Sequence, residues 1–196
     1  IETFIEDYEM DLKTIDVDYI KNVASSEIFP TWPENALIAN IYAQITFTLN
    51  RIFTEHYRSQ GYPFDITNLE AYDQAYVYGR DFFENISQIV DEIFNNYITR
   101  EGNYNPIYAR YCNGTTSLCP GGLSQWGSVD LANQGYAPID ILKYYYGDDI
   151  TLVEDAEVAD ARESYPGQPL RLGDNSLEVK GMQVRLNRIS KNYPSI

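Results

Sequence analysis

One long helix constrains the fold of this chain more than any other feature of its sequence. Apolar residues recur there at steps of three and four positions, which places them on one face of a helix. They are Leu37, Ile41, Ile45, Leu49 and Ile52, and the face is widened by Ala36, Ala39 and Ala43. Thr31-Trp-Pro-Glu34 has the form of a capping box that would begin this helix, and Ser59-Gln-Gly61 would end it. We therefore expect a buried central helix around which the rest of the chain packs.

The remaining pattern predicts an α+β fold that is mostly helical with a small β-sheet. Helical periodicity or helix-bounding residues mark 18–27, 80–97, 128–134 and 138–147, and short runs indicate strands at 10–17 and 106–111. Pro138 is placed to begin the last of these helices and Gly147 to end it. Residues 64–78 are aromatic but irregular, so we expect a loop there.

The C-terminal part of the chain is predicted to form a separate unit. Residues 154–169 are acidic and contain two prolines and a glycine, a composition typical of a linker. Residues 170–196 carry a single amphipathic helix pattern, and one helix cannot bury its own apolar face. We therefore divide the sequence into a domain at 1–153, a linker at 154–169 and an incomplete module at 170–196.

Composition narrows the function classes. The chain has 29 acidic residues against 14 Lys and Arg, for a formal net charge of −15. This charge argues against nucleic acid and against an anionic membrane surface as partners. No apolar run is long enough to span a bilayer. No signal peptide is recognisable, but the chain begins at Ile1 rather than at a methionine, which leaves export open.

Glu27 is the strongest candidate for chemistry. It lies four positions after Val23 and three after Ala24, and it shares a helix face with them and with Ile20. A carboxylate on an apolar face is costly to ionise, so its pKa should rise toward the value that a general acid needs near neutral pH. The simpler alternative is that Glu27 caps the following turn or pairs with a lysine.

Two segments resemble the hallmarks of the stage II sporulation protein D family. Residues 18–37 and the following Ile-Ala-Asn-Ile-Tyr-Ala-Gln resemble its Tyr-Val-x-x-Val-x-x-Glu-Met run, then Trp or Pro, then Ala-Leu-Lys-Ala-Gln-Ala. Gly122-Leu-Ser-Gln-Trp-Gly127 and residues 131–147 resemble its Gly-Met-Ser-Gln-Trp-Gly run and the helix after it. The details are most similar to the clostridial spore cortex-lytic enzymes of the SleC type. Residues 170–196 likewise resemble the start of a peptidoglycan-binding domain.

The resemblance implies a lytic transglycosylase that acts on peptidoglycan. Such an enzyme cleaves the MurNAc–GlcNAc bond and releases 1,6-anhydromuropeptides, here from the spore cortex in sporulation or germination. Glu27 matches the glutamate of the first hallmark, which assigns it the role of general acid and base. The implied partners are glycan strands and an activating protease. The implied location is the cortex or the cell wall, outside the cytoplasm, and no cofactor is implied.

The resemblance also suggests residues that would contact the glycan. They are Tyr42, Gln74, Tyr76, Ser124, Gln125 and Trp126. For the last three the alternative is structural, with the tryptophan in the core and the other two in a turn. On the central helix, Asn40 stands where the family has Gln, and Ile45 where Arg is common. These departures weaken the transfer of substrate contacts to that helix.

The two cysteines of the chain are Cys112 and Cys119. Their spacing suits a short disulfide loop, a pair of thiols or two ligands of a zinc ion. Zinc would need further ligands, and the single histidine, His56, lies far away on the long helix. In the family, histidines are common at the places of these cysteines, so the family's metal chemistry does not transfer. An exported location favours the disulfide, and we expect no metal site.

Other chemistries fit the sequence less well or differ in one requirement. A single histidine on a core helix cannot support a Ser-His or Cys-His triad. A muramidase that hydrolyses the same bond would need a second carboxylate about 5–9 Å from Glu27. Asp65, Asp73 and Asp130 are available as helpers, and Asp73 or Asp130 could be that carboxylate. A non-catalytic wall-binding or amidase-enhancing protein of the same superfamily is the alternative from a different class.

Overall fold

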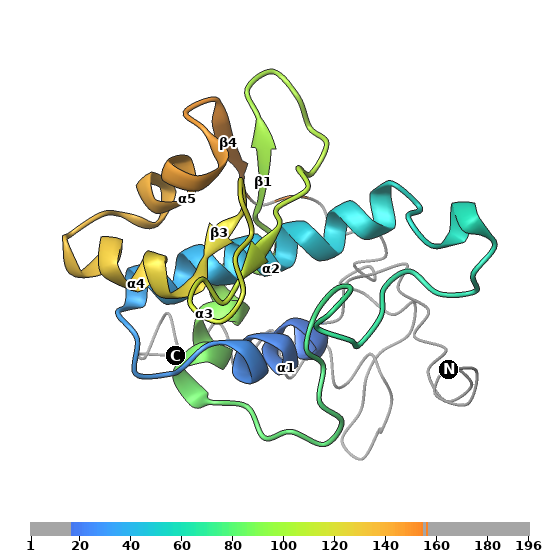
Figure 1. The fold of residues 1–196 in the computed structure, drawn as a ribbon, viewed down its shortest axis with the longest axis horizontal. Helices are drawn as coiled ribbons and strands as arrows, with labels where there is room; N and C mark the ends of the chain where they lie inside the picture. Colours follow the sequence, from blue (N-terminus) through green and yellow to red (C-terminus); the bar gives the residue numbers. More distant parts are fainter. Residues whose placement is uncertain (1–16, 155, 157–196) are drawn as a thin grey trace, which may run out of the picture. The chain divides into compact units, whose positions relative to one another are not determined.

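The computed structural model of the protein describes residues 17–154 and residue 156. Its central element is α2 (Glu34–Phe53), which crosses the middle of Figure 1. Helices α1 (Val17–Glu27) and α3 (Glu84–Ile93) pack on one side of α2, and α4 (Gln125–Asn133) and α5 (Pro138–Tyr146) pack on the other. With its short strands the fold is α+β, and the prediction of a buried central helix is confirmed.

Both ends of the chain lie largely outside the described residues. The strand expected at 10–17 is outside them except for Val17, which begins α1. The linker expected at 154–169 and the module expected at 170–196 are also outside, apart from residues 154 and 156. The end of the first domain therefore stays a prediction.

Helix α2 is covered on two faces by two separate clusters of buried side chains. One cluster joins it to α1 and α3, and the other joins it to α4, α5 and the strands. The first includes Leu37, Ile41 and Ile45, and the second includes Ala39, Tyr42 and Ala43. A helix that is apolar on more than one face is stable only when it is buried between other elements. The alanines therefore form part of a second contact face and not simply a wider first one.

Four short strands pair in two small sheets. Strand β1 (Tyr97–Arg100) runs antiparallel to β4 (Ile150–Val153), with Tyr97 opposite Val153. Strand β2 (Tyr111–Cys112) runs parallel to β3 (Leu123–Ser124). The strand expected at 106–111 is wrong except for its last residue. Strands of two to four residues are too short to show a clear alternation, so β1, β3 and β4 were not predictable.

The bounds of α2 differ from those expected. Thr31 does not cap the helix, because the N-cap is the extended Pro33 and no side chain makes the capping bond. The Trp32 amide instead donates to the Phe29 carbonyl at 3.0 Å, which closes a turn before the helix. At the other end α2 stops at Phe53, well before Ser59, and Glu55 takes a left-handed conformation with φ 49°. A short 3₁₀ helix, η2 (Arg58–Gln60), follows.

Two other helices also have different bounds from the prediction. The helix expected at 80–97 is only the ten residues of α3, because Phe83 is extended and Tyr97 pairs with β4. Helix α4 begins at Gln125, three residues earlier than expected, because the Ser124 hydroxyl accepts a capping hydrogen bond from the Gly127 amide at 3.0 Å. Helix α5 begins and ends as predicted.

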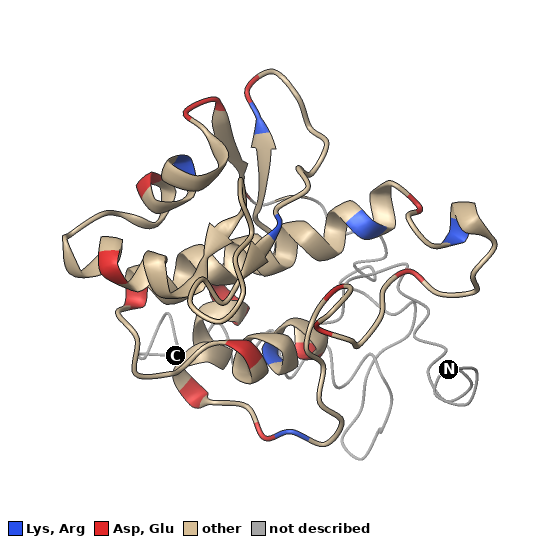
Figure 2. Ribbon diagram, in the orientation of Figure 1, with Lys and Arg blue, Asp and Glu red and all other residues tan. Residues whose placement is uncertain are grey.

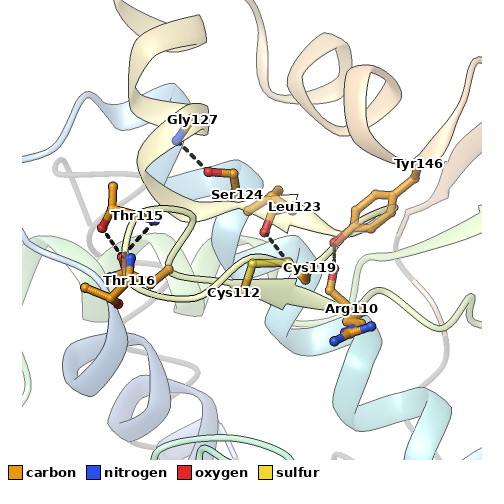
Figure 3. The surroundings of a disulfide bond; sticks show 10 residues. Arg110, Cys112, Thr115, Thr116, Cys119, Leu123, Ser124, Gly127 and Tyr146 are labelled. Atoms are coloured by element: carbon orange, nitrogen blue, oxygen red, sulfur yellow. Dashed lines mark hydrogen bonds between the residues drawn. A yellow bond between two sulfur atoms is a disulfide. The ribbon is translucent and has the colours of Figure 1, made fainter.

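Cys112 and Cys119 form a disulfide bond, with their Cα atoms 5.9 Å apart. Figure 3 shows that it connects β2 to the loop before β3, close to Leu123 and Ser124. It therefore closes the loop 113–118 beside the only place where β2 and β3 pair. Because each sulfur is bonded to the other, neither is available as a zinc ligand. Among the described residues no cluster of three His, Cys, Asp or Glu side chains could hold a metal ion.

Removing the disulfide should weaken the fold. A Cys112→Ser, Cys119→Ser protein should lose roughly 2–3 kcal/mol of unfolding free energy, because the bond restricts a short loop in the unfolded chain. Urea denaturation measures the loss. Alkylation of the unfolded, unreduced parent should label no thiol. Two labelled thiols would contradict the disulfide, and stoichiometric zinc in the purified protein would favour the metal site instead.

Candidate functional site

Glu27 is the last residue of α1, at the point where that helix leaves the core. The face of α1 that carries it is deeply buried, since Ile20, Val23 and Ala24 are fully covered by α2 and α3. Glu27 itself is half-buried. The apolar pattern of α1 therefore places one carboxyl group at the boundary between the core and the surface.

The carboxyl group of Glu27 is held by two neutral donors from two other elements. The side-chain amide of Gln44, on α2, donates to Oε2 at 2.8 Å. The backbone amide of Ala75, in the loop after η2, donates to Oε1 at 2.8 Å. The alternative that Glu27 pairs with a lysine does not hold for Lys21, which is bonded to Asp91. The carboxyl group is thus fixed in place, and no Lys or Arg in the described part of the chain forms an ion pair with it.

Burial raises the pKa of Glu27 from 4.5 to about 7. Hydrogen bonds from the Ala75 amide, Tyr111 and Gln44 lower the pKa by less than burial raises it, and the nearby charge of Glu70 raises it slightly further. A carboxyl group with this pKa is present in both protonation states near neutral pH. It can therefore donate a proton in one step and accept one in the next.

Two unsatisfied polar atoms lie beside Glu27. The hydroxyl of Tyr111, in β2, is buried, and both burial and the charge of Glu27 raise the pKa of Tyr111. Neither the Tyr111 hydroxyl nor Oε1 of Gln44 makes a hydrogen bond of good geometry within the described part of the chain. Buried polar atoms normally have partners. These two buried atoms could therefore bond to Glu27 if its side chain or the Gln44 amide turned.

A second layer of buried polar groups supports the first. Oε1 of Gln74 accepts hydrogen bonds from the Tyr19 hydroxyl at 2.9 Å and the Thr48 hydroxyl at 2.8 Å. Its amide donates to the Gln44 carbonyl at 3.1 Å. Gln74 is fully buried, so in this structure it does not reach the surface and instead holds the loop against α1 and α2; its contact with a glycan stays a prediction. Tyr76, also expected at the glycan, is stacked on Tyr19 with ring centroids 5.6 Å apart.

The other residues expected to bind substrate do not all reach the surface. Tyr42 is buried in the cluster shared with α4 and α5, and Gln125 is buried at the start of α4. Both are too deeply placed to touch a glycan here. Ser124 ends β3 and acts as the N-cap of α4, which is a structural role but not the turn given as its alternative. Trp126 is not in the core, since 38% of its surface is exposed.

Trp126 belongs to an exposed aromatic cluster next to Glu27. Its ring lies 5.0 Å from that of Trp32 and 5.9 Å from that of Phe29, measured between centroids. Phe29 follows Glu27 by two residues and is 54% exposed. The two hallmark segments of the sequence, far apart along the chain, therefore meet at this cluster. Phe29 was not among the expected site residues.

Two of the three predicted helper aspartates form ion pairs with arginines, and the third is exposed. Asp65 is bonded to Arg58, and Asp73 is bonded to Arg51. Asp130 is exposed on α4. The carboxylate whose charge acts on Glu27 is Glu70, which the sequence did not single out. Figure 2 shows Asp and Glu spread over the described ribbon, with Lys and Arg scattered singly among them.

A polar stripe on the central helix could have revealed the site from the sequence. Four buried polar residues recur on α2 at steps of four and three positions: Asn40, Gln44, Thr48 and Arg51. Such a stripe on a helix that is otherwise apolar requires polar partners from the elements that cover it. Gln44 bonds to Glu27 itself. Thr48 and Arg51 bond to side chains of the loop that contains Ala75. The apolar repeat of the same helix is stronger and masks this stripe in the sequence.

Comparisons with protein-family models, with curated proteins and with solved structures found no match. Among the described helices, none combines the length and the apolar character that crossing a membrane requires. The assignment of a function therefore depends on the site itself and on the sequence resemblance.

The raised pKa of Glu27 should make its cost to stability depend on pH. Folded protein binds the proton of Glu27 more tightly than unfolded protein does. The stability gained from this tighter proton binding is fully present below pH 4.5 and is lost as the pH rises through about 7. At pH 8 Glu27→Gln should unfold with up to about 3 kcal/mol more free energy than the parent. Below pH 4.5 the two should be nearly equal.

The substitution should be accommodated because the Gln44 amide can rotate and offer its unpartnered Oε1 to the new amide. Urea denaturation across this pH range measures the difference. Exposed Glu34, substituted by Gln, is the matched control and should show no such trend. A pH-independent difference for Glu27→Gln would refute the raised pKa.

Proposed function

We propose that the protein is a lytic transglycosylase that cleaves the MurNAc–GlcNAc bond of peptidoglycan. The observation that carries this proposal is the Glu27 carboxyl group, half-buried, held by neutral donors and with a pKa of about 7. A lytic transglycosylase needs one such group, which acts first as acid and then as base. A triad or a metal-dependent hydrolase would need groups that are not found together in the described residues.

The reaction needs no group beyond Glu27 to balance its protons. Protonated Glu27 donates its proton to the glycosidic oxygen as the bond from C1 of MurNAc to O4 of GlcNAc breaks. The ionised carboxylate then takes the proton of the C6 hydroxyl while O6 bonds to C1, which forms the 1,6-anhydro ring and restores Glu27. Gln44 and the Ala75 amide hold the carboxyl group in one orientation through both steps. Tyr111 is placed to donate to Glu27 while it is ionised.

The exposed aromatic cluster supports a glycan as the substrate. Phe29, two residues after Glu27, and Trp126, whose ring contacts that of Phe29, are both exposed at the surface. Sugar rings carry apolar C–H faces that pack on aromatic side chains. The cluster is therefore suited to hold a glycan strand across the end of α1.

The biological setting follows the sequence resemblance. The two hallmark segments are similar to those of the stage II sporulation protein D family, and their aromatic side chains Phe29 and Trp126 are in contact. We propose a SpoIID-like, SleC-type enzyme of the spore cortex or cell wall, working outside the cytoplasm in sporulation or germination. An activating protease and a peptidoglycan-binding segment after residue 169 belong to the same proposal.

One observation favours a second candidate, a muramidase that hydrolyses the same bond. Hydrolysis requires a second carboxylate near the acid, and the charge of Glu70 is close enough to affect the pKa of Glu27. Glu70 is exposed, so its carboxyl group lies in a position that water can reach. Glu70→Gln distinguishes the two mechanisms, since it should abolish hydrolysis but leave the lytic reaction largely intact.

Replacing Glu27 by Gln should remove the activity while the fold is kept. Glutamine keeps the shape and the hydrogen bond to the Ala75 amide but cannot donate an acidic proton, so the rate should fall roughly 10²–10⁴-fold. Mass spectrometry of the muropeptides released from purified cortex and from vegetative sacculi measures the loss. Glu34→Gln, exposed on α2, is the matched control and should act like the parent.

The outcome also separates the remaining alternative. A Glu27→Gln protein that releases anhydromuropeptides at the parent rate would refute the proposal. A parent that releases no product, yet binds peptidoglycan, would favour the non-catalytic wall-binding or amidase-enhancing protein.

A further inference from the structure

The loop between η2 and α3 brings one of the two donors to Glu27. Residues 61–83 contain no helix or strand, yet Asp65, Asp73 and Gln74 within them are buried. Asp73, Gln74 and Ala75 are consecutive, and each has a distinct buried partner. A long irregular loop has no ladder of backbone bonds to fix it. Side-chain contacts must therefore set where the Ala75 amide lies.

Asp73 is the most strongly bonded side chain of this loop. Its side chain is fully buried, and its Oδ1 accepts a hydrogen bond from Nε of Arg51 at 2.8 Å. Its Oδ2 accepts from the Tyr57 hydroxyl at 2.6 Å and from the amide and hydroxyl of Thr67, each at 2.8 Å. These four hydrogen bonds connect the loop to Arg51 near the end of α2, to Tyr57 just after it, and to Thr67 within the loop.

Arg51 is itself held from several sides. Only 9% of its side chain is exposed, and its guanidinium lies 4.9 Å from the ring centroid of Phe47 and 5.2 Å from that of Tyr108. Phe47 also contacts the ring of Tyr111, at 5.9 Å. Arg51 thus contacts aromatic side chains, one of which packs against Tyr111 beside Glu27. Its ion pair with Asp73 holds the loop that contains Ala75.

We propose that the buried Arg51–Asp73 ion pair is a positioning device that keeps the Ala75 amide on Oε1 of Glu27. This inference rests on the proposed function, in which Glu27 is the acid and base. Asp73 stands two residues before Ala75, and Gln74 between them is locked to Tyr19 and Thr48. Displacing Asp73 would therefore displace the donor, although Asp73 does not touch Glu27 or the substrate.

Two consequences follow for Glu27. Without the Ala75 bond its carboxyl group could turn away from the glycosidic oxygen, and misplacement of about 1 Å can cost up to about 100-fold in rate. That bond also lowers the pKa of Glu27, so losing it should keep Glu27 protonated to higher pH. The other titratable groups that face Glu27 are Tyr111 from β2, Tyr19 from α1 and Glu70 from the loop.

The test compares two ion pairs of the same region. Asp73→Asn keeps the shape but turns an amide toward donors that need an acceptor. Its control is Asp65→Asn, which breaks the pair between the buried Asp65 and the largely exposed Arg58 near the start of the same loop without touching the residues before Ala75. Arg51→Lys keeps the buried positive charge and decides the question if Asp73→Asn does not fold.

The decisive readout is the titration of Glu27. It is monitored by NMR of the carboxyl carbons of the full chain labelled with ¹³C-glutamate. The Glu27 signal is assigned by its absence in Glu27→Gln. The titration midpoint should move to higher pH in Asp73→Asn, less so in Arg51→Lys, and not at all in Asp65→Asn. The kcat of Asp73→Asn should fall up to about 100-fold with little change in KM.

Equal midpoints and equal kcat for folded Asp73→Asn and Asp65→Asn would overturn the positioning role. Equal midpoints in the parent and Arg51→Lys would overturn it if Asp73→Asn is unfolded. A parent that releases no anhydro product would refute the proposed function, and the shift in the Glu27 titration would then support or overturn the positioning role alone.

Discussion

The burial of α2 is the constraint on which the rest of this structure depends. Its apolar residues occupy two faces, so other elements must cover it from two directions. The same helix carries Gln44, Thr48 and Arg51, which are buried and polar. Because each needs a partner away from water, the covering elements bring polar groups to this stripe. The end of α1 and the loop 61–83 supply most of them, and Glu27 lies where the two meet.

The site shows how a carboxyl group can be ready for proton transfer without a charged partner. Burial raises the pKa of Glu27, and hydrogen bonds from Gln44 and the Ala75 amide limit the rise to a value of about 7. A lysine at the same distance would have held the group ionised. The positive charge of Arg51 is instead paired with Asp73. The buried Arg51–Asp73 pair therefore shapes the loop, and no Lys or Arg of the described residues forms an ion pair with Glu27.

Part of this arrangement was predictable from the sequence. The contacts and helix bounds that were not predictable each have a physical reason. The apolar repeats of α1 and α2 exceed two turns, so their faces could be identified, and with them the position of Glu27 at the end of a buried face, while Pro138 and Gly147 marked the bounds of α5. Gln44 is 17 positions and Ala75 is 48 positions away from Glu27 along the chain. No local sequence pattern predicts contacts between residues so far apart. The burial of Gln74 and Gln125 was missed because polar side chains are usually exposed. The end of α2 was placed too late because Glu55 turns the chain without a glycine.

The most direct test of the account is the fate of water in the reaction. Peptidoglycan is digested by the full chain in water enriched in ¹⁸O, and the released muropeptides are analysed by mass spectrometry. If Glu27 acts alone as acid and base, the products end in 1,6-anhydro-MurNAc, are one water lighter than reducing fragments and carry no ¹⁸O at C1. Reducing fragments with ¹⁸O at C1 would show that a water molecule attacks the glycan, and that result would contradict the lytic mechanism proposed for Glu27.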